Sequence, residues 1–182
     1  MIYNIGGCGF MAIFKPDIYK KDIFSIDFSK LKEDNIKCLI FDLDNTLGLL
    51  DDLKCPIKTK KLINELKKDF LVVIISNNTR GRIQYYLDDL EIDGVSLSMK
   101  PSIRGLIKIK NKYNLDKTQM CIIGDQMVTD IFAGNRYNIK TILVDPLGVK
   151  DLKITGLNRK IERYIINRYM KKQLFERGKY YG

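Results

Sequence analysis

Short apolar segments recur along the chain, and most of them are hydrophobic at every position. These segments cover residues 37–43, 70–76, 94–98, 120–124 and 140–145. Strands that are apolar throughout are typical of a parallel sheet with both faces covered. The segments between them have the length of helices, begin near capping residues such as Thr79 and Ser102, and cover residues 57–69, 79–91, 101–114 and 127–137. The pattern predicts a doubly wound, Rossmann-like α/β fold with a central parallel sheet.

The whole chain is expected to form one domain over residues 1–182, because its length suits a single core and no repeat or linker divides it. Residues 1–13 form an apolar N-terminal extension that lacks the basic region and cleavage site of a secretory signal. We expect this extension to pack as an N-terminal element, or to touch a partner or a membrane surface. No apolar run approaches the length needed to span a bilayer.

Residues 157–182 have the pattern of a basic amphipathic helix. The apolar stripe consists of Leu157, Ile161, Ile165 and Tyr169, and another face carries Lys160, Arg163, Asn167 and Lys171. Two interpretations stay open: a helix packed on the domain with a solvated charged face, or a helix that contacts an anionic membrane. Binding to RNA or a ribosome would also suit the charge, but the chain carries no recognised RNA-binding motif.

The composition excludes several kinds of site. The chain has no histidine, so mixed Cys/His zinc sites and Ser-His-Asp triads are excluded. The cysteines Cys8, Cys38, Cys55 and Cys121 are widely spaced, and Cys38 and Cys121 fall in apolar strands, where buried reduced thiols are expected. This cysteine usage favours a reducing cytosol. The net charge of +10 points to an anionic partner, which could be nucleic acid, a membrane or a phosphorylated substrate.

Polar side chains stand where four of the predicted strands end, which is where such sheets bind ligands. The residues are Asp42, Asp44 and Thr46 after the first strand, Ser76 and Asn77 after the second, Lys100 after the third, and Asp125 and Asp130 after the fourth. Carboxylates hold a hard cation, while hydroxyls, amides and an ammonium group bind phosphate oxygens. The set therefore predicts magnesium-assisted phosphoryl transfer.

Asp42 and Asp44 raise a particular electrostatic question, because alternate residues of a strand point to one face. Two carboxylates held together in that way repel each other, so a cation or a lysine is expected between them. A polar strand end followed by an Asp-Asn turn would explain this pair alone. It does not explain why matching polar groups follow the other strands.

The segments FDLDNTL, IISNN, KP and IIGDQMVTD resemble, in order, the four motifs of haloacid dehalogenase (HAD) superfamily phosphatases. Over roughly residues 14–170 the chain is similar to the YqeG-type branch of HAD subclass IIIA, which is related to phosphatidylglycerophosphate phosphatases. The resemblance implies a phosphatase that requires Mg²⁺. It also implies an open site without an inserted cap domain, because only a loop and one helix fit between successive motifs.

The resemblance assigns roles to these residues. Asp42 would be the nucleophile that forms an aspartyl-phosphate, and Asp44 the acid and base. Asp42, Asp125 and the main-chain carbonyl of Asp44 would hold the metal, and Asp130 would support it directly or through water. Thr46 would order the loop and belong to the phosphate-binding set. Ser76, Asn77 and Lys100 would bind the phosphate, Lys100 also serving catalysis.

Arg136 is a further candidate for phosphate binding, and a structural ion pair would explain it as well. Arg80 and Arg82 could meet a second phosphate, but exposed helix arginines are an equal explanation. We expect the substrate to be phosphatidylglycerophosphate, handled by a cytoplasmic enzyme in peripheral contact with the inner face of the membrane. The alternatives are a phosphatase of soluble sugar or nucleotide phosphates, and a non-catalytic phosphate-sensing or RNA-associated module.

Overall fold

The computed structural model describes residues 12–148, 163–169 and 175–182. Its centre is a six-stranded sheet in the order β1-β6-β5-β2-β3-β4, and every neighbouring pair is parallel. The strands are β1 (Ile18–Lys20), β2 (Cys38–Phe41), β3 (Leu71–Ile75), β4 (Asp93–Val95), β5 (Met120–Gly124) and β6 (Lys140–Val144). The predicted doubly wound α/β fold with a parallel sheet is thereby confirmed.

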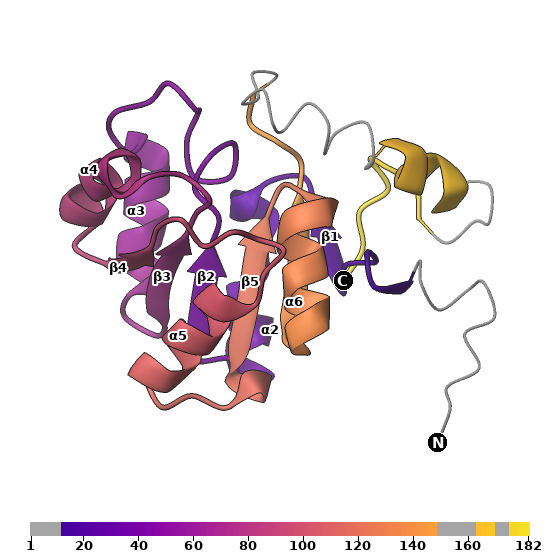
Figure 1. Cartoon of the computed structure of the whole chain (residues 1–182), viewed down its shortest axis with the longest axis horizontal. Coiled ribbons are helices and arrows are strands. Elements are labelled where there is room, and N and C mark those ends of the chain that lie inside the picture. The colour runs from indigo at the N-terminus through magenta and orange to yellow at the C-terminus, as the bar shows by residue number, and fades with distance from the viewer. Residues whose placement is uncertain (1–11, 149–162, 170–174) are drawn as a thin grey trace.

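Helices cover both faces of the sheet (Figure 1). They are α2 (Phe28–Glu33), α3 (Ile57–Leu66), α4 (Arg80–Leu90), α5 (Arg104–Lys112) and α6 (Phe132–Tyr137). Alternate residues of the central strands explain the two layers: Leu39 and Phe41 of β2 pack with α2, α3 and α4, while Cys38 and Ile40 pack with α5 and α6. Because every residue of β2 meets one of these layers, the strand had to be hydrophobic throughout.

Four elements of this part of the chain depart from the prediction. The segment expected as one helix over 127–137 divides into a π-helix, Met127–Ile131, and the α-helix α6. The strand expected over 94–98 ends at Val95, and Leu97 has a left-handed backbone with φ of 48°. Neither β1 nor α2 was predicted, because three and six residues are too few for a periodic pattern to stand out.

The C-terminal segment packs against β1 rather than forming the helix predicted over residues 157–182. Residues 163–169 are helical, but residues 175–182 are not, so that part of the prediction is wrong. The reason is that Gly178 adopts a left-handed φ of 85° and Tyr181 pairs antiparallel with Tyr19 of the edge strand. The remaining residues of the predicted helix lie outside the described part of the chain.

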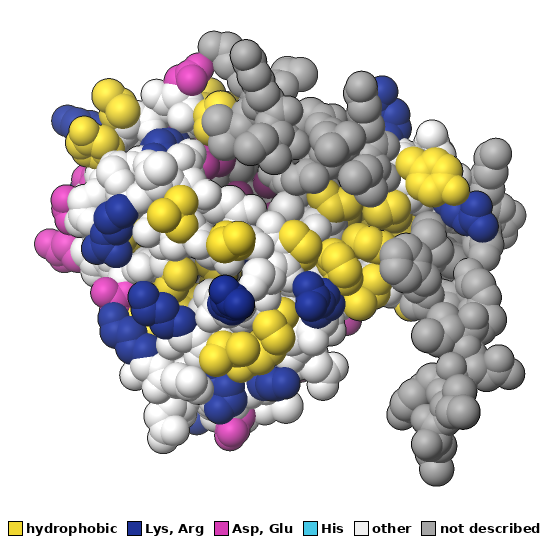
Figure 2. All heavy atoms as spheres, in the orientation of Figure 1, with side chains coloured by type: hydrophobic (Ala, Val, Ile, Leu, Met, Phe, Trp, Pro, Cys, Tyr) yellow, Lys and Arg dark blue, Asp and Glu magenta, His cyan; other side chains and the backbone are white. Residues whose placement is uncertain are grey.

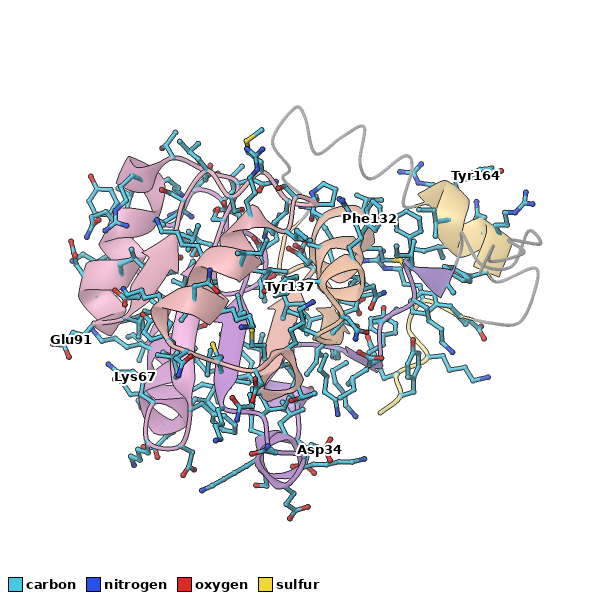
Figure 3. The ribbon with its side chains drawn as sticks, turned by 60° about the horizontal axis from the view of Figure 1, so that its bottom comes forward. Asp34, Lys67, Glu91, Phe132, Tyr137 and Tyr164 are labelled. Carbon is cyan, nitrogen blue, oxygen red and sulfur yellow. The ribbon has the colours of Figure 1, made fainter. Side chains whose placement is uncertain are left out.

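The short helix over 163–169 is docked through an apolar face. Ile165, Ile166 and Tyr169 are buried in a cluster with Tyr19 and Leu143, while Tyr164 is 61% exposed and points away from the sheet (Figure 3). Where the chain is described, the apolar residues of this helix therefore face the domain. Among the described helices, none is long and apolar enough to cross a membrane.

Candidate active site

The candidate site lies beyond the carboxyl ends of β2 and β5, two adjacent central strands. Asp42 follows β2 directly, and its backbone N–H donates to the carbonyl of Ile123 at 2.9 Å. Asp125 follows β5 directly. Since the strands are paired in register, their following residues arrive at one edge of the sheet, and both aspartates are buried there.

Three carboxylates meet at this edge. One oxygen each from Asp42, Asp125 and Asp130 lies within 4.8 Å of the others, and all three residues are buried. The Lys100 ammonium group enters the same cluster, with Nζ 2.5 Å from Asp42 Oδ1 and 2.6 Å from Asp130 Oδ1. The carbonyl of Ile75, the last residue of β3, also accepts from Lys100 Nζ at 3.1 Å.

Burial and neighbouring charges shift the pKa values of the ionisable groups in this cluster. Burial raises the pKa of Asp42 to about 7, with the Lys100 charge opposing the shift and the Asp130 charge adding to it. Burial lowers the pKa of Lys100, but the neighbouring carboxylates of Asp130 and Asp42 outweigh burial and raise it. Buried carboxylate oxygens from three residues converge within a few ångströms, so the donor set fits a divalent cation.

Asp130 is positioned by the π-helix that follows β5. Its Oδ2 accepts from the backbone N–H of Gln126 at 3.1 Å, and its backbone N–H donates to the carbonyl of the same residue. A Cβ atom on Gly124 would lie 2.3 Å from Asp130 Cγ, so only glycine permits this approach. The glycine of the GDQMVTD segment therefore has a direct structural reason.

Asp44 points to a different set of partners from Asp42. Its Oδ1 accepts from Arg82 Nη2 at 2.9 Å, and its Oδ2 accepts from Asn78 Nδ2 at 3.3 Å. Arg82 was noticed in the sequence without a firm role, because an arginine in the first turn of a helix carries no motif. Only the packing of α4 beside the loop after β2 reveals this pair.

The segment after β3 places Ser76 and fixes Lys100. Ser76 is buried, and its Oγ accepts from the backbone N–H of Asn78 at 3.0 Å. The Asn77 amide accepts from the backbone N–H of Lys100 at 2.6 Å and donates to the Lys100 carbonyl at 3.0 Å. The Asn77 side chain thus anchors the lysine, a contact that its predicted phosphate-binding role did not include.

Two other predicted residues lie in different surroundings. Thr46 is buried in the turn after Asp44, and within the described chain its Oγ1 has no hydrogen-bond partner. Arg136 is exposed on α6, where Nη1 donates to the carbonyl of Pro101 at 3.0 Å and Cζ lies 5.4 Å from the centre of the Phe132 ring. These contacts of Arg136 tie α6 to the lysine segment and do not bring it into the carboxylate cluster.

Comparisons with known proteins point to one kind of enzyme. The family described as Mitochondrial PGP phosphatase matches residues 11–93, and the family described as HAD-hydrolase-like matches residues 99–154. The chain is 36% identical over 160 residues to a protein named Probable phosphatase YqeG from Bacillus subtilis (strain 168), covering 87% of this chain and 93% of that protein.

More distant relatives carry a lipid phosphatase name. The chain is 25% identical over 170 residues to Phosphatidylglycerophosphate phosphatase 1, chloroplastic/mitochondrial, of Arabidopsis thaliana, covering 87% of this chain and 49% of that protein. The corresponding chloroplastic protein of Chlamydomonas reinhardtii is 25% identical over 186 residues, covering 92% of this chain and 69% of that protein.

Solved structures show the fold independently. An uncharacterised protein from Listeria monocytogenes serotype 4b superposes with a TM-score of 0.51 at 17% identity, covering 69% of this chain and 99% of that one. A haloacid dehalogenase-like protein from Bacteroides fragilis superposes with a TM-score of 0.50 at 15% identity, covering 67% and 93%.

Proposed function

This chain belongs to the family of HAD-type phosphatases that includes YqeG, and we propose that it hydrolyses the terminal phosphate of phosphatidylglycerophosphate with the help of Mg²⁺. Its membership makes it a phosphatase; the metal, the mechanism and the substrate are the proposal. The observation that carries the mechanism is the buried cluster of Asp42, Asp125, Asp130 and Lys100. A cluster of this kind has little structural benefit by itself, since buried charges cost stability unless they are well paired.

Asp42 is the proposed nucleophile. A carboxylate oxygen of Asp42 forms a bond to phosphorus while the bond from phosphorus to the leaving oxygen breaks, which yields an aspartyl-phosphate. Lys100 stays beside Asp42 and pairs with the phosphoryl oxygens as their charge develops. The O–H of Ser76 is proposed to donate to the same phosphoryl group, because the Ser76 oxygen is already oriented by the N–H of Asn78.

Asp44 is the proposed acid and base. It gives a proton to the leaving alcohol and then takes one from the water that hydrolyses the aspartyl-phosphate. Mg²⁺, held by the carboxylates of Asp42, Asp125 and Asp130 and by the main-chain carbonyl of Asp44, would supply charge neutralisation at the phosphoryl group. Thr46 is proposed to order the loop that carries Asp44.

The rim of the site supports a lipid substrate. Exposed apolar side chains occur in the loops that border Asp44: Leu49 (43% exposed), Leu53 (64%), Leu97 (62%), Met99 (69%) and Leu147 (44%). The Leu97 N–H donates to the carbonyl of Asn78, and the Leu49 carbonyl accepts from Arg82, so each of these residues is hydrogen-bonded directly to a partner of Asp44. The described chain between Asp42 and Lys100 holds no inserted domain that would cover this rim.

Contact with a membrane surface follows from this proposal. The chain carries a net charge of +10, which favours an anionic surface. On the face over α5 and α6, Lys and Arg side chains lie among hydrophobic ones (Figure 2). We therefore propose peripheral binding at the cytoplasmic face of the membrane, where such a lipid would be met.

The decisive experiment measures phosphate release from phosphatidylglycerophosphate in mixed micelles, beside a panel of sugar and nucleotide phosphates, with and without Mg²⁺. Asp42→Asn is the matched inactive control. Turnover of the lipid that requires both Mg²⁺ and Asp42 is the expected result. Turnover of soluble esters alone would keep the mechanism and reject the lipid. A non-catalytic role, including RNA binding, would regain support if Asp42→Asn left the cellular function intact.

A further inference from the structure

We propose that Arg82 is a positioning residue that holds the acid/base side chain of Asp44, together with the loop behind it, in the geometry needed for protonation of the leaving group. The inference rests on the proposed role of Asp44 and deepens it. It concerns the junction between α4 and the loop after β2, where Arg82 itself lies outside the four motifs.

Arg82 and Asn78 hold the two oxygens of Asp44 separately. Arg82 Nη2 lies 2.9 Å from Oδ1, and Asn78 Nδ2 lies 3.3 Å from Oδ2. The Arg82 and Asp44 side chains are 13% and 17% exposed, so this ion pair is largely shielded from water. A charge-assisted bond in such a place restricts the carboxylate more than the neutral amide bond does.

Arg82 also holds the loop that leads away from Asp44. The same Nη2 atom donates to the carbonyl of Leu49 at 3.0 Å. The loop is closed on itself by the N–H of Asn45, which donates to the carbonyl of Gly48 at 2.8 Å. One guanidinium group thereby connects the carboxylate of Asp44 with the main chain five residues later.

Tyr86, one turn further along α4, supports the same junction. Its ring is fully buried, and Arg82 Cζ lies 5.2 Å from the ring centre. The Tyr86 hydroxyl packs so closely on Gly48 that a Cβ atom there would lie 1.9 Å from it. Arg82 therefore lies between a rigid aromatic ring and the loop.

This arrangement has a specific chemical consequence. Protonation requires the acid to lie within hydrogen-bond reach of the leaving oxygen, and small displacements of such a group reduce the rate strongly. An Asp44 that loses Arg82 keeps its chemistry but gains rotational freedom. The loss in kcat/KM, which reports the steps up to departure of the leaving group, should therefore be larger where the leaving group needs a proton; the later step, in which Asp44 takes a proton from water, is common to all esters.

The test compares two classes of ester with Arg82→Gln and Arg82→Lys. Glycerol 3-phosphate has a basic alkoxide leaving group, whereas p-nitrophenyl phosphate releases a stable phenolate that needs little protonation. We expect Arg82→Gln to lower kcat/KM for the alkyl ester by about tenfold or more, up to the factor of about 10²–10⁴ that general acid catalysis supplies in full, and to affect the aryl ester much less. Arg82→Lys should recover part of the loss, with the change mainly in kcat.

Arg80→Gln is the matched control, because Arg80 lies in the same turn of α4, is exposed and donates to Gln84 Oε1 at 2.8 Å. It should leave both esters unaffected. In an Asp44→Asn background, Arg82→Gln should cause little further loss, since the two residues act as one unit.

Equal losses for both esters, or additive losses in the double variant, would overturn the proposal for Arg82 alone. Thermal unfolding shows whether a variant is inactive because it does not fold. If Arg82→Gln does not fold, a folded Arg82→Lys with the same ester dependence supports the proposal, and one without it overturns it. If the wild-type chain acts only on phosphatidylglycerophosphate, that lipid takes the place of the alkyl ester, and a loss with Arg82→Gln that is absent with Arg80→Gln is the expected result. Failure of the wild-type chain to hydrolyse the lipid and both esters would instead contradict the proposed function, and the Arg82 role with it.

Discussion

The charged side chains of the site form two separate groups, and each group has its own counter-charge. Asp42 and Asp130 share the Lys100 ammonium group, while Asp44 pairs with Arg82. The Lys100 side chain is only 2% exposed, so it cannot be removed without leaving carboxylates buried and unpaired. The two predictions at this scale follow from that burial.

Lys100→Met should reduce both activity and stability. Removing one partner of a buried ion pair costs about 3–5 kcal/mol, and chemical denaturation in the absence of divalent cations would measure it. Lys112→Met is the matched control, because the Lys112 and Asp93 side chains are each 53% exposed and their pair should contribute little. Equal destabilisation by the two changes would contradict the pairing of Lys100 described above.

The stability of the metal-free protein should depend on pH through Asp42. Its folded-state pKa is raised from 3.8 to about 7, chiefly by burial. Because the pKa is higher in the folded state, proton binding at Asp42 adds to the free energy of unfolding. This contribution is complete below about pH 4 and is lost as the pH rises through 7. Mg²⁺ favours the ionised carboxylates, so it should raise the Tm more at pH 8 than at pH 5.

The control for the metal effect uses one buried and one exposed aspartate. Asp125→Asn should remove the Mg²⁺-dependent rise in Tm, while Asp69→Asn, which changes an exposed residue paired with Lys32, should retain it. A rise of the same size in both variants would indicate that Mg²⁺ binds elsewhere. The carboxylate cluster would then not be the metal site.

The secondary-structure elements bring these residues together through backbone contacts that side-chain chemistry alone does not suggest. Asn77, just after β3, holds both main-chain groups of Lys100. The π-helix after β5 turns Asp130 back onto Gly124. The effect of replacing a glycine in this part of the fold should therefore depend on which atoms lie where the new Cβ atom would be.

Gly124→Ala should impair the site, because the added methyl group would overlap Asp130 and push it out of the cluster. We expect a large loss of kcat and a weaker response of the Tm to Mg²⁺. Gly81→Ala is the contrasting change: it lies within α4, nothing lies within 4 Å of the new Cβ atom, and alanine is the better helix former by about 1 kcal/mol. A functional Gly124→Ala enzyme would show that Asp130 does not need its observed position.

At the scale of the whole molecule, the chain combines an overall positive charge with an apolar rim around the proposed active site. The net charge is +10, and the rim includes two exposed residues, Leu97 and Met99, with left-handed φ angles of 48° and 55°. Non-glycine residues adopt this conformation at a cost, and asparagine tolerates it best. Exposed apolar side chains held in that conformation suggest a surface role rather than a packing role.

The double change Leu97→Asn with Met99→Asn should weaken binding to vesicles that contain anionic phospholipid. Asparagine suits the backbone at both positions, so the fold should be kept or slightly stabilised while the apolar surface is lost. Sedimentation with anionic and with zwitterionic vesicles measures the effect, and rising salt should weaken the anionic binding further.

The control for this change is Ile57→Gln, which removes an exposed apolar residue from α3, outside both the rim residues named above and the face over α5 and α6. It should bind vesicles like the wild-type chain. If the Leu97→Asn, Met99→Asn variant also bound vesicles unchanged, these two rim residues would have no part in membrane contact.

Sequence alone located the strands that matter and the residues that follow them. Segments such as Cys38–Phe41 and Met120–Gly124 are hydrophobic throughout because both faces of each strand are covered, so they stand out clearly. Once those strands are placed in a parallel sheet, Asp42, Asp125 and Lys100 must gather at one edge. The structure does bring these three residues together, with Asp130 beside them.

Tertiary structure alone decided which side chains hold that set in place. Arg82 pairs with Asp44, 38 positions earlier, and Asn77 holds Lys100, 23 positions later. Tyr181 pairs with Tyr19, which is 162 positions earlier and lies in a strand too short to show a sequence pattern. Hydrophobic periodicity reports burial because each residue meets its layer independently of the others. It does not report which polar groups form hydrogen bonds or ion pairs with each other, because that depends on how elements distant in the chain are packed.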